Sequence, residues 1–175
     1  MPTLNRKAIF TTAVSGISLT ILASCGGPDG RKAPENMNPP GDSIEKTSLS
    51  SMLPCESLTR EQEHDIRTQD TGTPKEIGNA KSCRWNLPEG ALSVTFHADK
   101  SIKEINLSSG EKKTFKINQK EGVIATGISE GSCTAAIPAN SAETVTIDAV
   151  GNNDTESCDL VRNVAPMVEK NISEN

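Results

Sequence analysis

The chain has 175 residues, a formal net charge of −5, five cysteines and few aromatic side chains. An acidic chain of this kind is not expected to bind nucleic acid or an anionic membrane surface. Its length fits one domain of ordinary size once targeting and linker segments are set aside.

The N-terminus has the composition of a bacterial export signal. Arg6 and Lys7 supply positive charge, and residues 8–22 follow without a single charged side chain. This stretch is shorter than the roughly 20 apolar residues that a membrane-spanning helix needs, and Ser and Thr residues interrupt it. We therefore predict that residues 1–24 are a signal peptide.

Residues 22–25 read Leu-Ala-Ser-Cys and resemble a lipobox, in which small side chains precede a cysteine. A plain secretory signal would leave Cys25 as an odd free thiol beside the cleavage site. Instead we predict that the Cys25 thiol receives diacylglycerol. A single acyl chain anchors a protein only weakly. We therefore also expect the new N-terminus to be acylated, for example with palmitate. The mature protein would then be a lipoprotein on the extracytoplasmic face of the cell membrane.

Loss of the signal leaves 16 basic and 23 acidic residues, so the mature chain carries a net charge of −7. Residues 25–53 hold four prolines among Gly, Asn, Ser and charged residues, with little to bury. We expect this segment to be a flexible tether that spans on the order of 30 Å. Residues 54–175 then form a single extracytoplasmic domain.

Four cysteines remain in this domain: Cys55, Cys83, Cys133 and Cys158. An even set in an exported domain predicts two disulfides, with three possible connectivities. We favour Cys55–Cys83 and Cys133–Cys158, because each pair joins the end of a helix-like segment to a nearby strand. The spacing fits neither the close pairs of structural zinc sites nor the C-x-x-C of redox centres, so we expect no metal and no other cofactor.

The domain is poor in aromatic side chains. It contains only Trp85, Phe96 and Phe115, so small aliphatic residues must fill its core. Such a thin core gains from disulfides, each of which is worth about 3–4 kcal/mol for loops of this size. Trp85 is expected to be buried against the bridge between Cys55 and Cys83.

The first elements of the domain can be read in chain order. Thr59 and Gln62 form a capping-box pattern, which predicts a short polar helix over residues 60–68. Gly72 and Pro74 then indicate a loop. Beyond this point, alternation of polar and apolar residues indicates short strands. The candidates are residues 82–87, 92–97, 102–107, 113–118, 123–128, 133–137 and 144–150.

Apolar residues at helical spacing predict a final helix; they are Leu160, Val161, Val164, Ala165 and Val168. Asp154 or Ser157 can cap its start, and Pro166 should kink it because proline removes a backbone donor. The order of elements predicts an α+β fold. An antiparallel sheet of about six short strands would be flanked by an N-terminal short helix and a C-terminal helix.

Few residues are candidates for chemistry. Residues 127–131 match G-x-S-x-G, but both histidines precede Ser129, whereas in hydrolases with this motif the histidine follows the serine. We therefore interpret this segment as a turn between strands. His64 and His97 fall on polar faces of a helix and a strand, where we expect ordinary surface side chains.

Four features occur together: Pro54-Cys55-x-x-Leu58-Thr59 before a helix, Cys83-Arg84-Trp85, a strand cysteine at Cys133, and Ser157-Cys158-Asp159 opening the last helix. In combination they resemble the actinobacterial lipoproteins of domain of unknown function 3558. The resemblance covers residues 54–172 and also the arrangement of lipobox and tether. It implies a cell-envelope lipoprotein, and it assigns no catalytic residue because the family has no assigned activity.

We therefore expect a binding or interaction module rather than an enzyme, held to the membrane through the lipid at Cys25. Its partner would be an envelope protein, a glycan or a small ligand, and not nucleic acid. The alternative is a cell-wall or envelope hydrolase. That function would require His64, His97 and an acidic residue within hydrogen-bond reach in a cleft.

Overall fold

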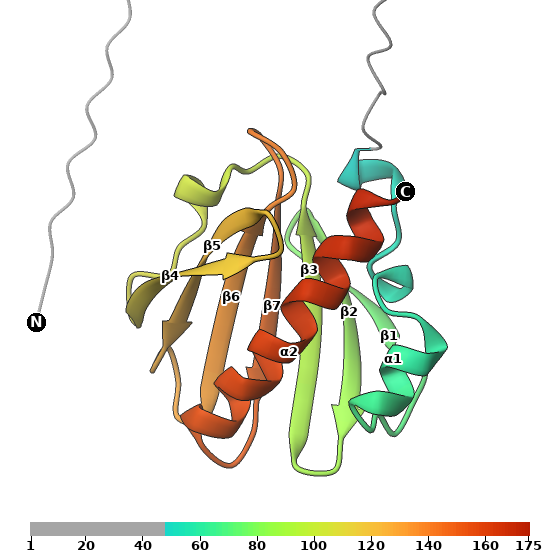
Figure 1. Ribbon diagram of the computed structural model, residues 1–175, viewed down its shortest axis with the longest axis vertical. Helices are drawn as coiled ribbons and strands as arrows, with labels where there is room; N and C mark the ends of the chain where they lie inside the picture. The colour runs from blue at the N-terminus through green and yellow to red at the C-terminus, as the bar shows by residue number, and fades with distance from the viewer. Residues whose placement is uncertain (1–47) are drawn as a thin grey trace, which may run out of the picture. The chain divides into compact units, whose positions relative to one another are not determined.

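Seven strands form one antiparallel sheet in the computed structural model, which describes residues 48–175. The order across the sheet is β1-β2-β3-β7-β6-β5-β4 (Figure 1). The fold is therefore two meanders, β1–β3 and β4–β7, which meet where β3 pairs with β7. The strands are β1 (Thr73–Ile77), β2 (Ala80–Leu87), β3 (Gly90–His97), β4 (Glu111–Ile117), β5 (Lys120–Thr126), β6 (Ser132–Pro138) and β7 (Thr144–Val150).

The sheet differs from the sequence prediction at two places. β1 forms where a loop was expected; it is an exposed edge strand, a position at which Pro74 is tolerated. Residues 102–107 were predicted to be a strand, but they contain the 3-10 helix η3 (Ile102–Glu104) and irregular chain. Their apolar side chains pack flat on the sheet instead of pairing with it, and the sheet has seven strands rather than about six.

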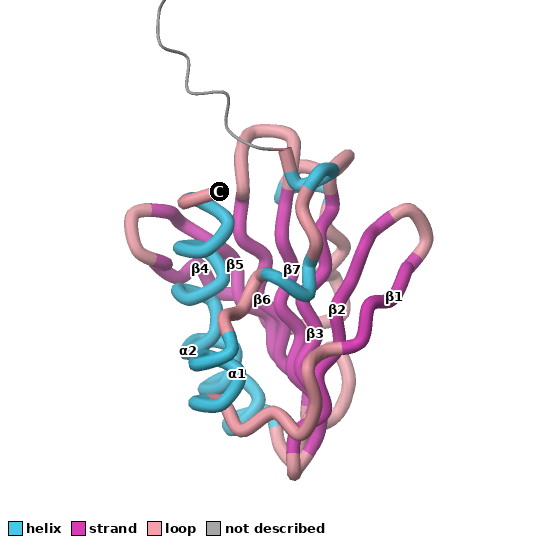
Figure 2. Tube along the Cα trace, turned by 90° about the vertical axis from the view of Figure 1, so that its right-hand side faces the viewer, coloured by secondary structure: helices cyan, strands magenta, loops and turns pink. Residues whose placement is uncertain are grey.

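Two α-helices, α1 (Arg60–Asp65) and α2 (Asp154–Ser173), lie on the same side of the sheet (Figure 2). The buried face of α2 packs on the apolar side chains of the central strands and forms the main core with them. Each buried methyl-bearing side chain contributes about 1.5–3 kcal/mol of transfer free energy. The largest buried residues in this core are Trp85, Leu92, Val94, Phe96, Ile117, Ile124, Ile137, Val145, Ile147, Val161, Val164 and Val168.

The start of α2 differs in detail from the prediction. Asn153, rather than Asp154 or Ser157, is the N-cap, and its Oδ1 accepts a 2.9 Å hydrogen bond from the Glu156 N–H. Ser157 is buried and donates to the Gly131 carbonyl at 2.7 Å, so it links α2 to the sheet. Pro166 lies inside α2, and the helix continues past it to Ser173.

Both disulfides have the predicted pairing. Cys55–Cys83 joins the 3-10 helix η2 (Pro54–Glu56) to β2, and Cys133–Cys158 joins β6 to α2. Trp85 is fully buried beside the first bridge, as predicted: a Cβ atom at Gly72 would lie 2.6 Å from Trp85 Nε1 and 2.7 Å from Cys83 Sγ. Gly72 has φ +72°, so both its conformation and its surroundings require glycine.

The folded domain begins before residue 54, the boundary that the sequence indicated. Residues Leu49–Ser51 form a 3-10 helix, η1, and Leu49 is buried in the main core. The Glu143 carboxylate accepts hydrogen bonds from Ser48 Oγ at 2.5 Å and from the Leu49 N–H at 3.3 Å. Residues 48–53 therefore belong to the domain rather than to the tether.

The predicted signal peptide and Cys25 lie outside the described residues. Between residues 48 and 175, none of the helices has both the length and the apolar character needed to cross a membrane.

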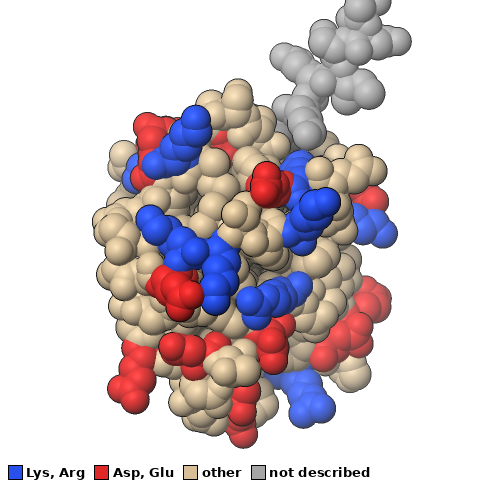
Figure 3. Space-filling view, turned by 60° about the vertical axis from the view of Figure 1, so that its left-hand side comes forward, with Lys and Arg blue, Asp and Glu red and all other residues tan. Residues whose placement is uncertain are grey.

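Both edge strands carry features that discourage further strand pairing. β4 holds Lys112, Lys113 and Lys116, and β1 holds Pro74 and Lys75. In Figure 3 the Lys and Arg side chains occupy mainly the upper half of the visible face, and most Asp and Glu side chains lie in its lower half. We therefore interpret the lysines of β4 as residues that protect a sheet edge from pairing with another strand.

Candidate functional site

The two faces of the central strands differ in chemistry. On β3 and β7, apolar residues such as Val94 and Ile147 face α2, whereas Thr95, His97 and Thr146 alternate with them and face the other way. The opposite face is therefore polar along its middle. Several of these polar side chains are nonetheless buried, so something covers them.

The cover is the connection between β3 and β4, residues 98–110, which we call the crossover. It must carry the chain from the centre of the sheet to its far edge, and it includes η3 (yellow-green in Figure 1). Ile105 and Leu107 of the crossover pack with Ala125 and Ala136 in a second, smaller apolar cluster on this face.

A cleft of about 310 Å³ remains beside the crossover, and we call it the crossover cleft. This volume is at the lower end of the range for small-molecule sites. Four polar residues of the sheet line it: His97, Thr134, Thr146 and Asp148. Three apolar residues also line it, namely Ile105, Leu107 and Ile128. The exposed residues Lys100, Glu104 and Asn106 complete the lining.

The polar residues of the cleft form a connected set. His97 Nε2 lies 3.3 Å from Thr146 Oγ1, and Thr134 Oγ1 donates to Asp148 Oδ1 at 2.6 Å. Thr146 also hydrogen-bonds Asp148. In the tautomer with the proton on Nε2, His97 donates to the Thr146 hydroxyl and Nδ1 is an acceptor.

Two buried polar atoms on β3 and β7 have no hydrogen-bond partner among the described residues. They are His97 Nδ1 and Thr144 Oγ1. The two residues are directly opposite each other on β3 and β7. Buried polar atoms are nearly always hydrogen-bonded. Each of these two atoms can therefore make a further hydrogen bond, for which the described residues supply no partner.

Burial shifts both titratable groups of the sheet wall towards their neutral forms. Desolvation lowers the pKa of His97, and the positive charge of Lys100 adds to this effect while Asp99 opposes it. Desolvation raises the pKa of Asp148, against the hydrogen bonds from Thr134 and Thr146.

The structure does not bring the two histidines together. His64 is exposed on α1, on the helix side of the sheet, whereas His97 lies in the cleft on the other side. Asp99 is the acidic residue that acts on His97, and Asp148, for which no role was predicted, lines the same cleft. The signal was present in β7, where Thr144, Thr146 and Asp148 alternate with apolar residues and place a carboxyl group inside a strand.

The G-x-S-x-G segment is a turn between β5 and β6, as interpreted from the sequence. Gly127 and Gly131 have φ values of +73° and +69°, which favour glycine. The Ser129 N–H donates to Ser132 Oγ at 2.9 Å, and the Ser132 hydroxyl donates back to the Ser129 carbonyl at 2.7 Å. These bonds close the turn.

A second pocket of about 270 Å³ lies between the β2–β3 turn and the start of α2, with Arg67, Leu87, Val150 and Leu160 in its lining. Two of its polar residues are used within the protein. Ser157 donates to Gly131, and Glu89 accepts from Asn152 Nδ2 at 3.1 Å. We favour the crossover cleft, because its sheet wall gathers four polar residues in a connected set.

Across residues 48–175 there is no group of three or more His, Cys, Asp or Glu side chains arranged to hold a metal ion. Comparison with curated proteins and with solved structures gives no significant match. A family described as "protein of unknown function (DUF3558)" matches residues 20–171, a range that includes Cys25 and nearly all of the folded domain. The chain therefore belongs to the DUF3558 family.

Proposed function

We propose that the protein is a lipid-anchored, extracytoplasmic binding protein that holds a small ligand in the crossover cleft without transforming it. The observation that carries the proposal is the cleft itself, whose sheet wall of His97, Thr134, Thr146 and Asp148 faces the aliphatic side chains of Ile105, Leu107 and Ile128. Such a combination of a few convergent polar groups and apolar surface is typical of small-molecule sites.

The geometry favours binding over hydrolysis. In a hydrolytic triad a carboxylate orients the histidine through the ring nitrogen that does not face the nucleophile. Here His97 Nδ1 has no carboxylate partner, and Asp148 is held by Thr134 instead. The backbone of Ser129 is bonded within its turn, and Ser129 is not among the residues that line the cleft. The cleft thus contains hydrogen-bonding groups without an activated nucleophile.

The proposed location rests on the lipobox at residues 22–25 and on the two disulfides, which are characteristic of proteins outside the cytoplasm. Replacement of the lipidated cysteine, Cys25→Ala, should release the protein from membranes or leave the precursor uncleaved. Mass spectrometry of the N-terminal peptide checks the modification. An unmodified Cys25 thiol on the mature wild-type protein would contradict it.

Ligand binding can be tested in cells with a photo-crosslinking amino acid. Glu104 lies at the cleft, and Glu76 is an equally polar, exposed residue on β1 that serves as a matched control. The reagent placed at position 104 should give a peptide adduct of small-molecule mass that is absent at position 76. No adduct at position 104, or the same adduct at both positions, would refute a ligand site in the cleft.

A further inference from the structure

The hydrogen-bonding groups of the crossover cleft define what a ligand must offer. The threonine hydroxyls donate and accept, His97 contributes an imidazole ring, and Asp148 contributes a carboxyl group. A hydroxyl group can satisfy any of these, because it both donates and accepts. Several hydroxyls on one small framework match a wall built from neighbouring positions of β3, β6 and β7.

The charges in the cleft do not favour an ionic ligand. Lys100 and Glu104 are exposed and opposite in sign, so they leave the entrance without a net charge. On the sheet wall, burial favours the neutral forms of His97 and Asp148, so an ion that entered would lose water and meet no strongly charged partner there.

The remaining lining is aliphatic. Ile105, Leu107 and Ile128 offer an apolar surface, and no Phe, Tyr or Trp is among the lining residues. A ligand with hydroxyls on one side and C–H groups on another can use both kinds of surface at once. The volume of about 310 Å³ limits it to a small molecule.

We infer that the crossover cleft binds a neutral, hydroxyl-rich ligand with one apolar face, of which a single sugar ring is the simplest example. This inference rests on the proposed function and names the chemical class of its ligand.

Isothermal titration of the intact purified protein tests the class directly. The probes are methyl β-D-glucopyranoside, which is neutral, glucuronate, which is anionic, and glucosamine, which is cationic; cyclohexanol provides the apolar ring with one hydroxyl. The neutral glycoside should bind at least about tenfold more tightly than the other three, because it alone has several hydroxyls and no charge.

Variants locate the binding within the cleft. Thr134→Val removes a hydroxyl that contacts Asp148 and should weaken glycoside binding by about tenfold. Thr114→Val makes the same change at an exposed position on β4 and should have no effect. Retained folding of each variant is checked by its thermal unfolding.

The outcomes separate the two proposals. Tighter binding of a charged probe or of cyclohexanol would overturn the ligand class while leaving a binding site in the cleft. Binding that Thr134→Val and Thr114→Val affect equally would overturn the assignment to the cleft. Absence of binding by all four probes would overturn the class, and the crosslinking from position 104 would then decide the proposed function independently.

Discussion

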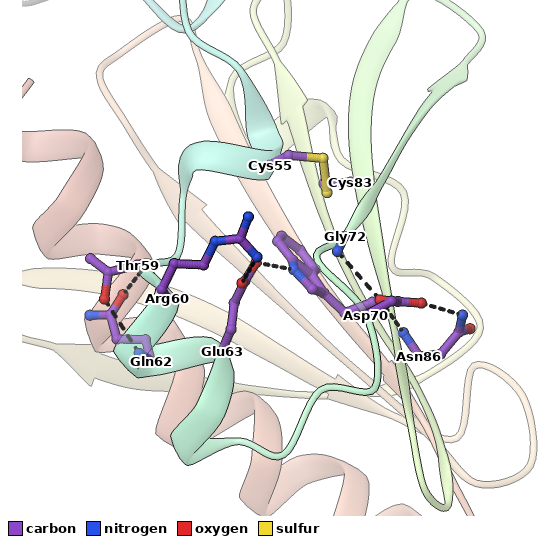
Figure 4. Close-up of polar contacts among 10 residues, drawn as sticks. Cys55, Thr59, Arg60, Gln62, Glu63, Asp70, Gly72, Cys83 and Asn86 are labelled. Carbon is purple, nitrogen blue, oxygen red and sulfur yellow. Dashed lines mark hydrogen bonds and ion pairs between the residues drawn. A yellow bond between two sulfur atoms is a disulfide. The ribbon is translucent and has the colours of Figure 1, made fainter.

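Trp85 Nε1 donates a 2.7 Å hydrogen bond to Glu63 Oε1, and both residues are buried. The second carboxylate oxygen of Glu63 pairs with Arg60 at 3.3 Å (Figure 4). This contact fixes α1 to β2 close to the Cys55–Cys83 bridge. It explains how a six-residue polar helix with little apolar surface is held on the domain.

Glu63→Ala should destabilise the domain by about 1–3 kcal/mol, because the substitution leaves the buried Trp85 N–H without an acceptor. Glu61→Ala, on the exposed side of the same helix, should change the free energy of unfolding by less than about 0.5 kcal/mol. Urea unfolding followed by Trp fluorescence measures both. Equal effects of the two variants would show that the Trp85–Glu63 hydrogen bond does not stabilise the fold.

Removal of the second bridge in the double variant Cys133→Ala, Cys158→Ala should cost about 2–5 kcal/mol. The bridge joins β6 to the first turns of α2, so hydrogen exchange should increase there before it increases in β2 and β3. Exchange mapped by mass spectrometry tests the order. A uniform increase over the whole domain would contradict local loosening of α2.

Asp148→Asn provides a test of the pKa shift in the cleft. The pKa of Asp148 is raised in the folded protein, so ionisation of this carboxyl group opposes folding. The free energy of unfolding of the wild type therefore increases as pH falls through the raised pKa of the folded state towards the pKa of the unfolded state. The variant has no carboxyl group at this position and lacks this pH-dependent contribution. Its stability relative to wild type should be greatest near pH 7 and should decrease steadily towards about pH 4.

Urea unfolding at several pH values measures the difference between Asp148→Asn and wild type. Asp159→Asn, an exposed residue of α2, is the control and should show no such trend. A stability difference for Asp148→Asn that grows as pH falls would mean that the carboxyl is stabilised in its charged form, contrary to its burial.

Local patterns predicted much of the fold. The capping box of Thr59 and Gln62, both disulfides, the burial of Trp85 and the final helix are present in the structure. These features depend on residues close in sequence or on a small set of cysteines. β1 was not predicted because an exposed edge strand has no alternation of apolar and polar residues. Residues 102–107 have the apolar content of a strand, but their apolar side chains cover the sheet.

The cleft could not be predicted because it depends on strand order. His97 and Asp148 are far apart in the chain and line the same cleft only because β3 pairs with β7. The crossover that closes the cleft exists because β4 lies at the opposite edge of the sheet from the β1–β3 meander. Neither relationship follows from the alternation within a single strand.

The central claim is that the crossover cleft binds a small ligand, and the two histidines of the chain allow a direct test by NMR. The imidazole signals of His97 report on the cleft, and those of exposed His64 are an internal reference on the other side of the sheet. A library of small polar fragments is titrated into the intact protein. If the cleft binds a small ligand, some fragments shift the His97 signals and leave those of His64 unchanged. A library that shifts neither histidine, or His64 alone, would contradict ligand binding in the cleft.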